Sequence, residues 1–535
     1  MENRATSIAV FVVLSTVPLA AHAATIVVGP SDDYRKIESA KAGDTVLIAP
    51  GTYKFRVFLS QAGTQSAPIV IRAQDPSNRP VWDLTGTPVN SWPGSYTAGD
   101  NDRGCWQVRN AYYDISGIVF RGCHSDANEN AGGIRFVQAH HLTIRDCLFQ
   151  NDDNGIIGNG DDVLVEFSEF DHNGTPTSDQ EHSIYFLGGS KFTLRYSYVH
   201  DALHGQNFHS RAAETVLEYN WFARAGDYEG DLQTNSSVAL QTLFLRGNVF
   251  IGKDNPDNSS KVLTLFNDTN APNLAMKLTA VWNTFIVRAN PPPAIVQLGN
   301  DRLTNVEVEF SNNVVVGTTR AWVVAAPGTA NWSVTGTKNW FPTGADVGAL
   351  SQTIFGADPG FRNAAALDFA PGATSQLLGQ ADTGVGGPPV AEYYKDETTT
   401  AMFRWRNTVK DIGAFESSTA GEGLGPGDAG PPPSRDGGGP IADGGAGVKD
   451  GGRSTDQNDG APSTPNGALD SGGSSPHDSS SGDDNRAGCA CAVRSTSSAG
   501  SWVCLVLAAS GLAGAAARRR ERDARGGHDV WSRDG

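Results

Sequence analysis

Histidines are concentrated in one part of this 535-residue chain, beside residues of the kinds that transfer protons. Seven of the eleven histidines lie between positions 124 and 204, and His209 and Arg211 follow shortly after. Cleavage of a uronic-acid polymer by β-elimination requires a cation beside the sugar carboxylate, a base for the neighbouring C–H and an acid for the leaving oxygen. Arg211 can neutralise the carboxylate, His209 can act as the base and Tyr185 as the acid, with His182 beside them.

Carboxylates in the same region allow a second chemistry. Hydrolysis of a glycosidic bond uses two opposed carboxyl groups, about 5 to 10 Å apart. Glu229 and Asp231, together with Glu181, are the candidates for that pair. The residues expected to contact a sugar chain are Arg135, His204, Asn207 and Tyr228.

A short apolar phrase that recurs along the chain indicates which elements position these residues. Its copies end 29, 21, 29, 23, 28, 35 and 30 residues apart, so one structural coil per repeat is expected, with insertions at a tolerant corner. Each copy is too short and too rich in β-branched and aromatic residues for a helix. The pattern therefore predicts a solenoid of strands, with copies at 115–120, 144–149, 165–170, 194–199, 217–222, 245–250, 280–285 and 310–315.

A second apolar piece precedes the recurring phrase in several repeats. Side chains alternate between the two faces of a strand, which predicts that Ile134, Ile156, Ile184 and Phe208 point into the core. Their neighbours then form an outward column of Arg135, Ile157, Tyr185 and His209. Asp231 and Glu229 join this column if Leu232 points inward, although Leu232 lies 13 residues before Leu245 where earlier pairs are 9 or 10 apart.

Other recurring residues favour structural roles. Asn220, Asn248, Asn283 and Asn313 occupy one position of the repeat and predict a stacked corner ladder. Cys105, Cys123 and Cys147 favour buried free thiols over a bridge, with a Cys123–Cys147 disulfide as the alternative. The acidic positions 152, 153, 161, 162 and 171 match no calcium-binding loop, so they favour solvated turns, and no cofactor is identified.

Two phrases carry a resemblance to a known fold. Residues 43–53 (GDTVLIAPGTY) resemble the opening coil of right-handed parallel β-helix proteins of the pectate-lyase-like superfamily, and residues 411–416 (DIGAFE) resemble a phrase that closes many of them. The resemblance covers about residues 25 to 417. It implies an all-β right-handed parallel β-helix over 24–417, and the amphipathic stretch 33–41 supplies an N-terminal helical cap.

The segments that contain the candidate site resemble a narrower group. Residues 181–185, 209–212 and 228–232 are similar to a subgroup of bacterial β-helix proteins described as polysaccharide-degrading enzymes. That subgroup has Asn at the place of Ser183, His at Gln206 and Lys at His209. The resemblance therefore supports Arg211 best and leaves the identity of the base open.

The two ends of the chain differ in composition from the repeats. Residues 1–23 have the pattern of an export signal, and 418–487 are rich in Gly, Pro, Ser and Asp and predict a disordered linker. Residues 488–535 contain an apolar stretch, expected to form a short helix, followed by three arginines. The last segment resembles the C-terminal sorting signal of myxobacteria and their relatives. These features predict an exported protein that is secreted or attached to the cell envelope or outer membrane at the cell surface.

The charge limits the partners. The chain carries −17, of which the linker contributes −7 and the last segment +3, so the repeat domain is strongly acidic. An acidic domain argues against nucleic acid as a partner. We expect a monomer that acts on a polysaccharide as a lyase. The alternatives are a glycoside hydrolase, a non-catalytic carbohydrate-binding or adhesive module, and a surface spacer.

Overall fold

The computed structural model describes residues 23–95, 104–125, 130–177, 180–257, 261–267, 269, 271, 273–299, 302–323, 331–393 and 403–422. Nearly all of the expected export signal, most of the expected linker and the whole of 488–535 lie outside these ranges. Within them, none of the helices has the length and apolar character needed to cross a membrane.

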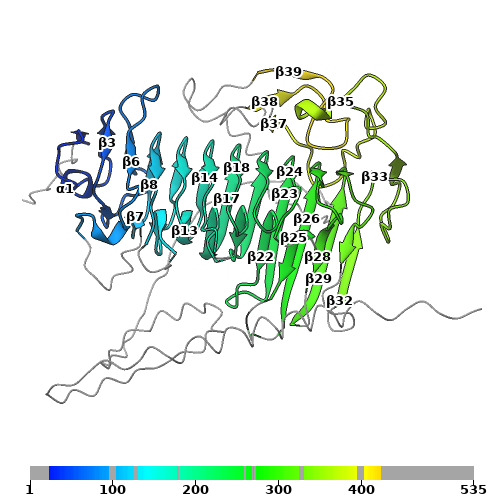
Figure 1. Cartoon of the computed structure of the whole chain (residues 1–535), viewed down its shortest axis with the longest axis horizontal. Helices are drawn as coiled ribbons and strands as arrows, with labels where there is room; N and C mark the ends of the chain where they lie inside the picture. Colours follow the sequence, from blue (N-terminus) through cyan, green and yellow to red (C-terminus); the bar gives the residue numbers. More distant parts are fainter. Residues whose placement is uncertain are drawn as a thin grey trace, which may run out of the picture. The chain divides into compact units, whose positions relative to one another are not determined.

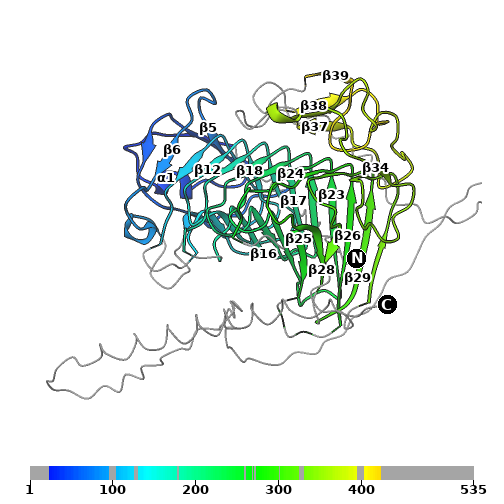
Figure 2. The ribbon, with the colours of Figure 1, turned by 45° about the vertical axis from the view of Figure 1, so that its right-hand side comes forward.

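Strands in the described residues form three long parallel sheets, stacked coil upon coil (Figures 1 and 2). Sheet A contains β1 (Thr25–Val28), β2 (Thr45–Ile48), β5 (Ile69–Ala73), β8 (Tyr113–Ser116), β11 (Thr143–Arg145), β14 (Val163–Glu166), β17 (Lys191–Arg195), β20 (Glu214–Glu218), β23 (Leu240–Arg246), β26 (Leu274–Val281), β29 (Leu303–Ser311) and β32 (Asn331–Thr335).

Sheet B follows sheet A along each coil, and sheet C follows sheet B. Sheet B contains β3 (Thr52–Tyr53), β6 (Val81–Asp83), β9 (Val119–Arg121), β12 (Leu148–Gln150), β15 (Glu169–Asp171), β18 (Tyr198–His200), β21 (Trp221–Ala223), β24 (Val249–Ile251), β27 (Thr284–Ile286), β30 (Val314–Val316), β33 (Trp340–Pro342) and β34 (Ile354–Gly356). Sheet C contains β4 (Val57–Leu59), β7 (Gly104–Val108), β10 (Gly132–Phe136), β13 (Asn154–Asn159), β16 (Ile184–Gly188), β19 (Phe208–Ser210), β22 (Gly230–Gln233), β25 (Lys261–Phe266), β28 (Ala294–Leu298) and β31 (Trp322–Val323).

This arrangement is consistent with the expected right-handed parallel β-helix. Coils pair in register, so equivalent positions of the repeat stack, as Phe120, Phe149 and Phe170 do in sheet B. Their ring centroids are 5.1 and 4.8 Å apart, close to the roughly 4.8 Å spacing of paired strands. Inward aromatic and aliphatic side chains thereby form one continuous core along the stack.

The asparagine ladder lies at the corner between sheets A and B. The side-chain oxygen of Asn248 accepts from the backbone N–H of Asn220 at 3.0 Å, and Asn283 does the same for Asn248 at 2.9 Å. Asn313 continues the series, which extends one coil beyond the expectation to Asn339. All five side chains are buried, so the ladder satisfies backbone groups that the tight corner leaves without strand partners.

A four-residue helix, α1 (Arg35–Glu38), lies within the amphipathic stretch 33–41 and buries Ile37. Two short 3₁₀ helices, η1 (Val89–Ser91) and η2 (Ala364–Ala366), lie in connections.

The C-terminal part of the domain differs from the expectation. The parallel coils end at β34, and the chain then forms antiparallel strands that continue past the expected boundary at 417. These strands are β35 (Phe361–Asn363), β36 (Asp368–Pro371), β37 (Ala391–Tyr393), β38 (Phe403–Arg406) and β39 (Thr419–Glu422).

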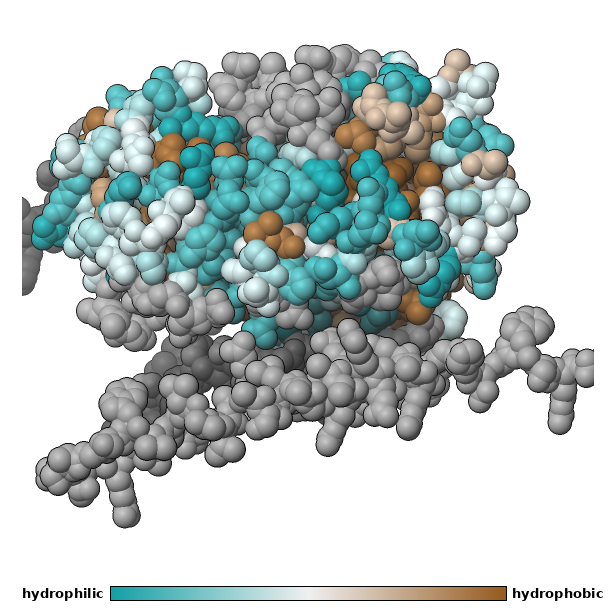
Figure 3. Space-filling model, viewed as in Figure 1, coloured by the Kyte–Doolittle hydropathy of each residue, from teal (hydrophilic) through white to brown (hydrophobic). Residues whose placement is uncertain are grey.

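Phe369, Tyr393 and Phe415 pack on Trp221 and so cover outward residues of sheet B. Figure 3, in the view of Figure 1, shows a mostly hydrophilic surface on which apolar residues gather toward the C-terminal strands, with smaller apolar spots elsewhere.

The expectation of free thiols at Cys105 and Cys123 is wrong. These two residues form a disulfide with a Cα–Cα distance of 5.9 Å, and the alternative Cys123–Cys147 bridge is absent because Cys147 is a buried free thiol. Cys123 lies in the turn that leads to β10, and β10 pairs with β7, which contains Cys105. The bridge therefore ties a turn to the coil below it.

Candidate functional site

The expected column of outward side chains is present on sheet C. Arg135 pairs with Ile157 and Ile157 with Tyr185, while Tyr185 pairs with His209 and His209 with Asp231. Leu232 is buried in the core, so the register left open by its spacing places Asp231 on the outer face. We call Arg135, Ile157, Tyr185, His209 and Asp231 the sheet C column.

Three aromatic rings gather at the centre of this column. The ring centroid of His209 lies 4.4 Å from that of Tyr185 and 5.0 Å from that of His182. His182, which precedes β16, also meets Tyr185 edge-on at 4.8 Å. The three proton-transfer candidates of the sequence are therefore in mutual contact.

Both imidazoles are held in the neutral form. Burial, followed by the nearby positive charge of Arg211, lowers the pKa of His182 to about 3. Its Nδ1 accepts a hydrogen bond from the backbone N–H of Gln206 at 3.4 Å, which places the ring proton on Nε2. Burial, then Arg211 and His182, also lowers the pKa of His209 well below its usual value. A neutral imidazole can accept a proton at neutral pH.

His209 is buried without the hydrogen bonds that usually accompany burial. Its side chain is about 5% exposed, and within the described part of the chain neither ring nitrogen has a hydrogen-bond partner. Nδ1 lies 3.4 Å from a carboxylate oxygen of Asp231, but the contact does not have the geometry of a hydrogen bond. Burial of an imidazole without hydrogen-bond partners costs folding free energy. A ligand that forms hydrogen bonds with the ring would explain why such a residue is present.

Asp231 and Arg211 frame His209 with opposite charges. Gln233 donates from Nε2 to both carboxylate oxygens of Asp231, at 2.8 and 2.9 Å, and so fixes the orientation of that group. Arg211 directly follows β19 and is half-buried. Its positive charge lowers the pKa of both His182 and His209.

Gln233 and Lys261 belong to this region, although the repeat pattern does not single them out. Gln233 lies two residues after Asp231 on the same strand, so strand alternation places its side chain on the same face as that of Asp231. Lys261 stands at the start of β25 with its Nζ 4.2 Å from the ring centroid of Tyr228, and its charge interacts with Asp227 and Asp231. Burial lowers the pKa of Lys261, against the opposing effect of these two carboxylates.

A hollow of about 290 Å³, counting space open to solvent, lies beside Tyr228 and Lys261. Lys253 and Arg288 contribute further positive charges to its lining. Asp227 and Glu229 line it as well, so the hollow combines three cations with two carboxyl groups.

Two expected site residues are buried inside the coil. Asn207 donates to the carbonyl of Ala223 at 3.0 Å and to Glu229 at 2.6 Å, and Glu229 also accepts from the backbone N–H of Ala225. Both residues are buried, and their hydrogen bonds to each other and to the backbone favour a structural role, although Glu229 also borders the hollow beside Lys261. They precede β19 and β22, where strand alternation does not apply. Burial raises the pKa of Glu229 to about 7.

The remaining expected residues occupy different places. Arg135 lies two coils from Tyr185 along the column, roughly 10 Å away at the usual strand spacing, and donates to the carbonyl of Asn130. His204 lies in the turn before β19 and pairs with Asp257 at 2.7 Å. Glu181 is buried and accepts from the hydroxyl of Thr175.

Comparison with known proteins gives a fold-level likeness. No protein-family model matches the chain, and no curated protein matches it significantly in sequence. Among solved structures, the chain is similar to the alginate lyase from Paenibacillus sp. str. FPU-7, with 15% identity and a TM-score of 0.32 over 62% of this chain and 97% of that one. It is similar to pectate lyase Pel9A, with 15% identity and a TM-score of 0.41 over 74% and 96%.

A third solved structure, the GH136 lacto-N-biosidase from Eubacterium ramulus, has 9% identity and a TM-score of 0.38 over 62% of this chain and 68% of that one. Structural similarity at these identities and TM-scores does not indicate a shared activity. The fold follows from the strand order of the chain itself.

Proposed function

We propose that this chain is a polysaccharide lyase that cleaves a uronate-containing glycan by β-elimination. The observation that carries the proposal is His209, a neutral, buried imidazole without hydrogen-bond partners in the described residues, in contact with Tyr185 and close to the charge of Arg211. The candidate base, acid and cation thus lie beside one another at the sheet C column.

Each residue has a role that its surroundings support. Arg211 binds the uronate carboxylate and stabilises the negative charge that develops when the adjacent carbon loses its proton. His209 takes that proton on a ring nitrogen. The electron pair of the C–H bond forms a C=C bond, the glycosidic C–O bond breaks, and the Tyr185 hydroxyl protonates the leaving oxygen. Asp231, oriented by Gln233, stabilises the imidazolium formed on His209.

The placement of the carboxylates does not support the hydrolase alternative. Of its three candidates, Glu181 and Glu229 are buried in turns and Asp231 lies on the sheet C column. An inverting or retaining pair needs two carboxyl groups that face the same sugar ring. Asp231 has no such counterpart among these three.

Positive charge along the same face supports an anionic substrate. Lys261 stands on the coil after Asp231, and Lys253 and Arg288 line the hollow beside it. Asp227 and Glu229 line the same hollow, which lies at the turns between sheets B and C. A sugar carboxylate bound there would meet cations from successive coils, despite the acidic composition of the domain.

Incubation of the full chain with a panel of uronate and neutral polysaccharides tests the proposal. The expected result is new ultraviolet absorbance from unsaturated chain ends with one uronate polymer, and its loss in Arg211→Ala. Lys277→Ala, which removes an exposed cation of sheet A, is the matched control and should retain activity. Binding without turnover by the unaltered chain would instead indicate a carbohydrate-binding module.

We also propose that the chain is exported and displayed at the cell surface. The leader-like first 23 residues and the sorting-signal resemblance of 488–535 motivate this, and the Cys105–Cys123 disulfide is typical of an oxidising compartment. Cell fractionation with protease treatment of intact cells tests it. A chain that stays in the cytoplasm with an intact N-terminus would contradict the proposal.

A further inference from the structure

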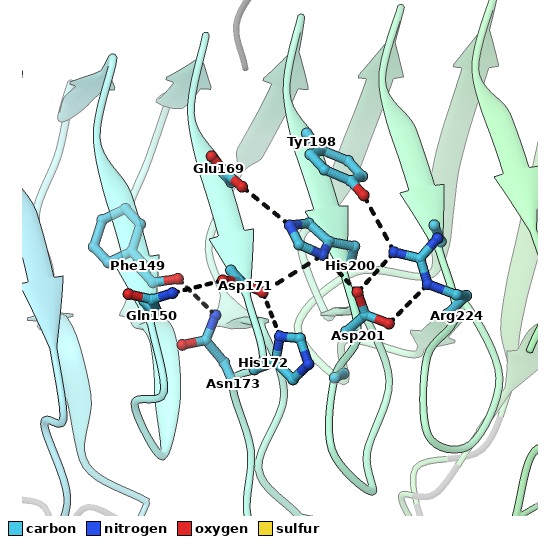
Figure 4. A network of polar contacts seen from close by, with 12 residues as sticks. Phe149, Gln150, Glu169, Asp171, His172, Asn173, Tyr198, His200, Asp201 and Arg224 are labelled. Carbon is cyan, nitrogen blue, oxygen red and sulfur yellow. Dashed lines mark hydrogen bonds and ion pairs between the residues drawn. The ribbon is translucent and has the colours of Figure 1, made fainter. Parts of the chain in front are cut away.

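A second cluster of titratable side chains lies on sheet B, apart from the sheet C column. It contains Asp171, His172, His200 and Asp201, which we call the sheet B cluster (Figure 4). Asp171 and His200 are the last residues of β15 and β18 and are direct partners across these paired strands. His172 and Asp201 follow them, and both have left-handed backbone conformations, with φ of 52° and 54°.

One donor atom from each of the four residues lies within 4.8 Å of all the others. His200 Nδ1 is 2.7 Å from Asp201 Oδ2 and 3.6 Å from Asp171 Oδ1, while His172 Nδ1 contacts Asp171 Oδ1. Tetrahedral coordination with metal–ligand bonds of about 2.1 Å places donor atoms roughly 3.4 Å apart. The observed separations bracket that value, so small side-chain rotations would form the coordination sphere.

The groups around the cluster orient its members. Glu169 contacts His200 Nε2 at 3.2 Å, which leaves Nδ1 directed at the other three residues. Gln150 donates to Asp171 Oδ2 at 2.7 Å, so the opposite oxygen, Oδ1, faces the cluster. Arg224 donates to both oxygens of Asp201, at 2.8 and 2.7 Å. A carboxylate behind a histidine and hydrogen bonds behind each ligand carboxylate are the usual outer partners of a metal site.

The net charge of the sheet B cluster and its neighbours is negative, as a site for a divalent cation requires. Asp171, Asp201 and Glu169 bring three negative charges, and Arg224 brings one positive charge, so neutral imidazoles leave a net charge of −2. Two imidazole nitrogens and two carboxylate oxygens suit Zn²⁺ and similar transition metals. Ca²⁺ takes six to eight oxygen ligands and fits this donor set poorly.

We propose that Asp171, His172, His200 and Asp201 form a binding site for a divalent transition metal ion of the Zn²⁺ class. The site ties together two successive coils where sheet B turns toward sheet C. It is independent of the proposed lyase chemistry, because its residues belong to a different sheet from the sheet C column.

Equilibrium dialysis of the full chain against Zn²⁺ and, separately, Ca²⁺, with metal analysis of the protein, tests the site. We expect one bound Zn²⁺ per chain and no comparable Ca²⁺ binding. His172→Ala removes a ligand whose side chain is about half exposed, so the fold should be retained while Zn²⁺ binding is lost. Glu169→Gln should weaken binding roughly tenfold, the lower end of the effect of an outer partner.

His141→Ala is the matched control. His141 pairs with Asp162 at 3.0 Å on the surface of a neighbouring coil and resembles His172 in residue type and exposure. This variant should bind Zn²⁺ like the unaltered chain. No binding, or binding that His172→Ala leaves unchanged or that His141→Ala abolishes, would overturn the proposal, and circular dichroism shows whether each variant remains folded.

Discussion

His182 and His209 on one side of the coils, and His200 on another, have opposite electrostatic surroundings. His182 and His209 belong to the sheet C side, where burial and Arg211 lower the pKa of both rings. On the sheet B side, burial acts in the same direction on His200, but hydrogen bonds to Asp201 and Glu169 outweigh it and raise its pKa to about 9. Burial acts in the same direction on all three rings, so the difference between them comes from the charged residues that each sheet places beside a ring.

The contrast assigns different chemistry to the two regions. A neutral ring beside a guanidinium can act as a base toward an anionic substrate. A ring surrounded by carboxylates attracts positive charge, whether a proton or a metal ion. Because the two regions lie on different sheets, a substitution in one should leave the other unchanged.

The largest expected effect is on turnover. His209→Ala removes the proposed base and should lower kcat by about 10²- to 10⁴-fold on the uronate polymer that the chain cleaves. His141→Ala, a histidine outside both regions, should leave kcat unchanged. Equal activity in both variants would remove His209 from the mechanism.

The second prediction concerns the difference between the pKa values of His182 and His200. In metal-free protein, we expect the NMR signals of His182 to titrate near pH 3 and those of His200 near pH 9. Assigned ring-proton or ring-nitrogen shifts across this range measure both. Titration of both rings near 6.5 would show that their surroundings do not differ as described.

Arg211→Gln sharpens the comparison by removing one charge. The pKa of His182 should rise, because Arg211 is the second cause of its depression after burial, whereas the pKa of His200 should not move. The same NMR titration measures the shift. A shift of both rings, or of neither, would contradict the local origin of the difference.

The smallest effect concerns stability against pH. The folded pKa of His182 lies below 6.5, so the unfolded chain binds more protons and stability is lost as pH falls from about 6.5 toward 3. For His200 the folded pKa is higher, so its contribution is present below about pH 6.5 and is lost as pH rises toward 9. Each contribution is on the order of a few kcal/mol.

Denaturant unfolding at several pH values checks these signs. His182→Gln should flatten the acid side of the stability profile, and His200→Gln the alkaline side. If His200→Gln instead flattens only the acid side, the pKa of His200 is lowered by folding rather than raised.

Much of the sheet C column could be predicted from the sequence. Repeat spacing and strand alternation place Arg135, Ile157, Tyr185 and His209 in one column because parallel coils pair in register. Strand alternation does not extend to Asn207 and Glu229, which lie in turns where side-chain direction depends on local hydrogen bonds. The disulfide between residues 105 and 123 was missed for a related reason, since the approach of its two cysteines depends on the path of a turn.

The sheet B cluster was missed although a signal for it exists. Asp171 and His200 directly follow Phe170 and Val199, which end two successive copies of the repeat and are paired in the structure. Their stacking follows from the repeat alone. The approach of His172 and Asp201 does not, because it depends on left-handed residues in the two turns.

The proposed function depends above all on a neutral His209 that removes a proton from a uronate bound at Arg211. Product analysis by mass spectrometry, after incubation of the full chain with uronate polymers, tests this step most directly. We expect oligosaccharides with an unsaturated uronate at the new end, formed by the unaltered chain and not by His209→Ala. Saturated products, or unsaturated products formed equally well without this imidazole, would contradict the proposed role of His209.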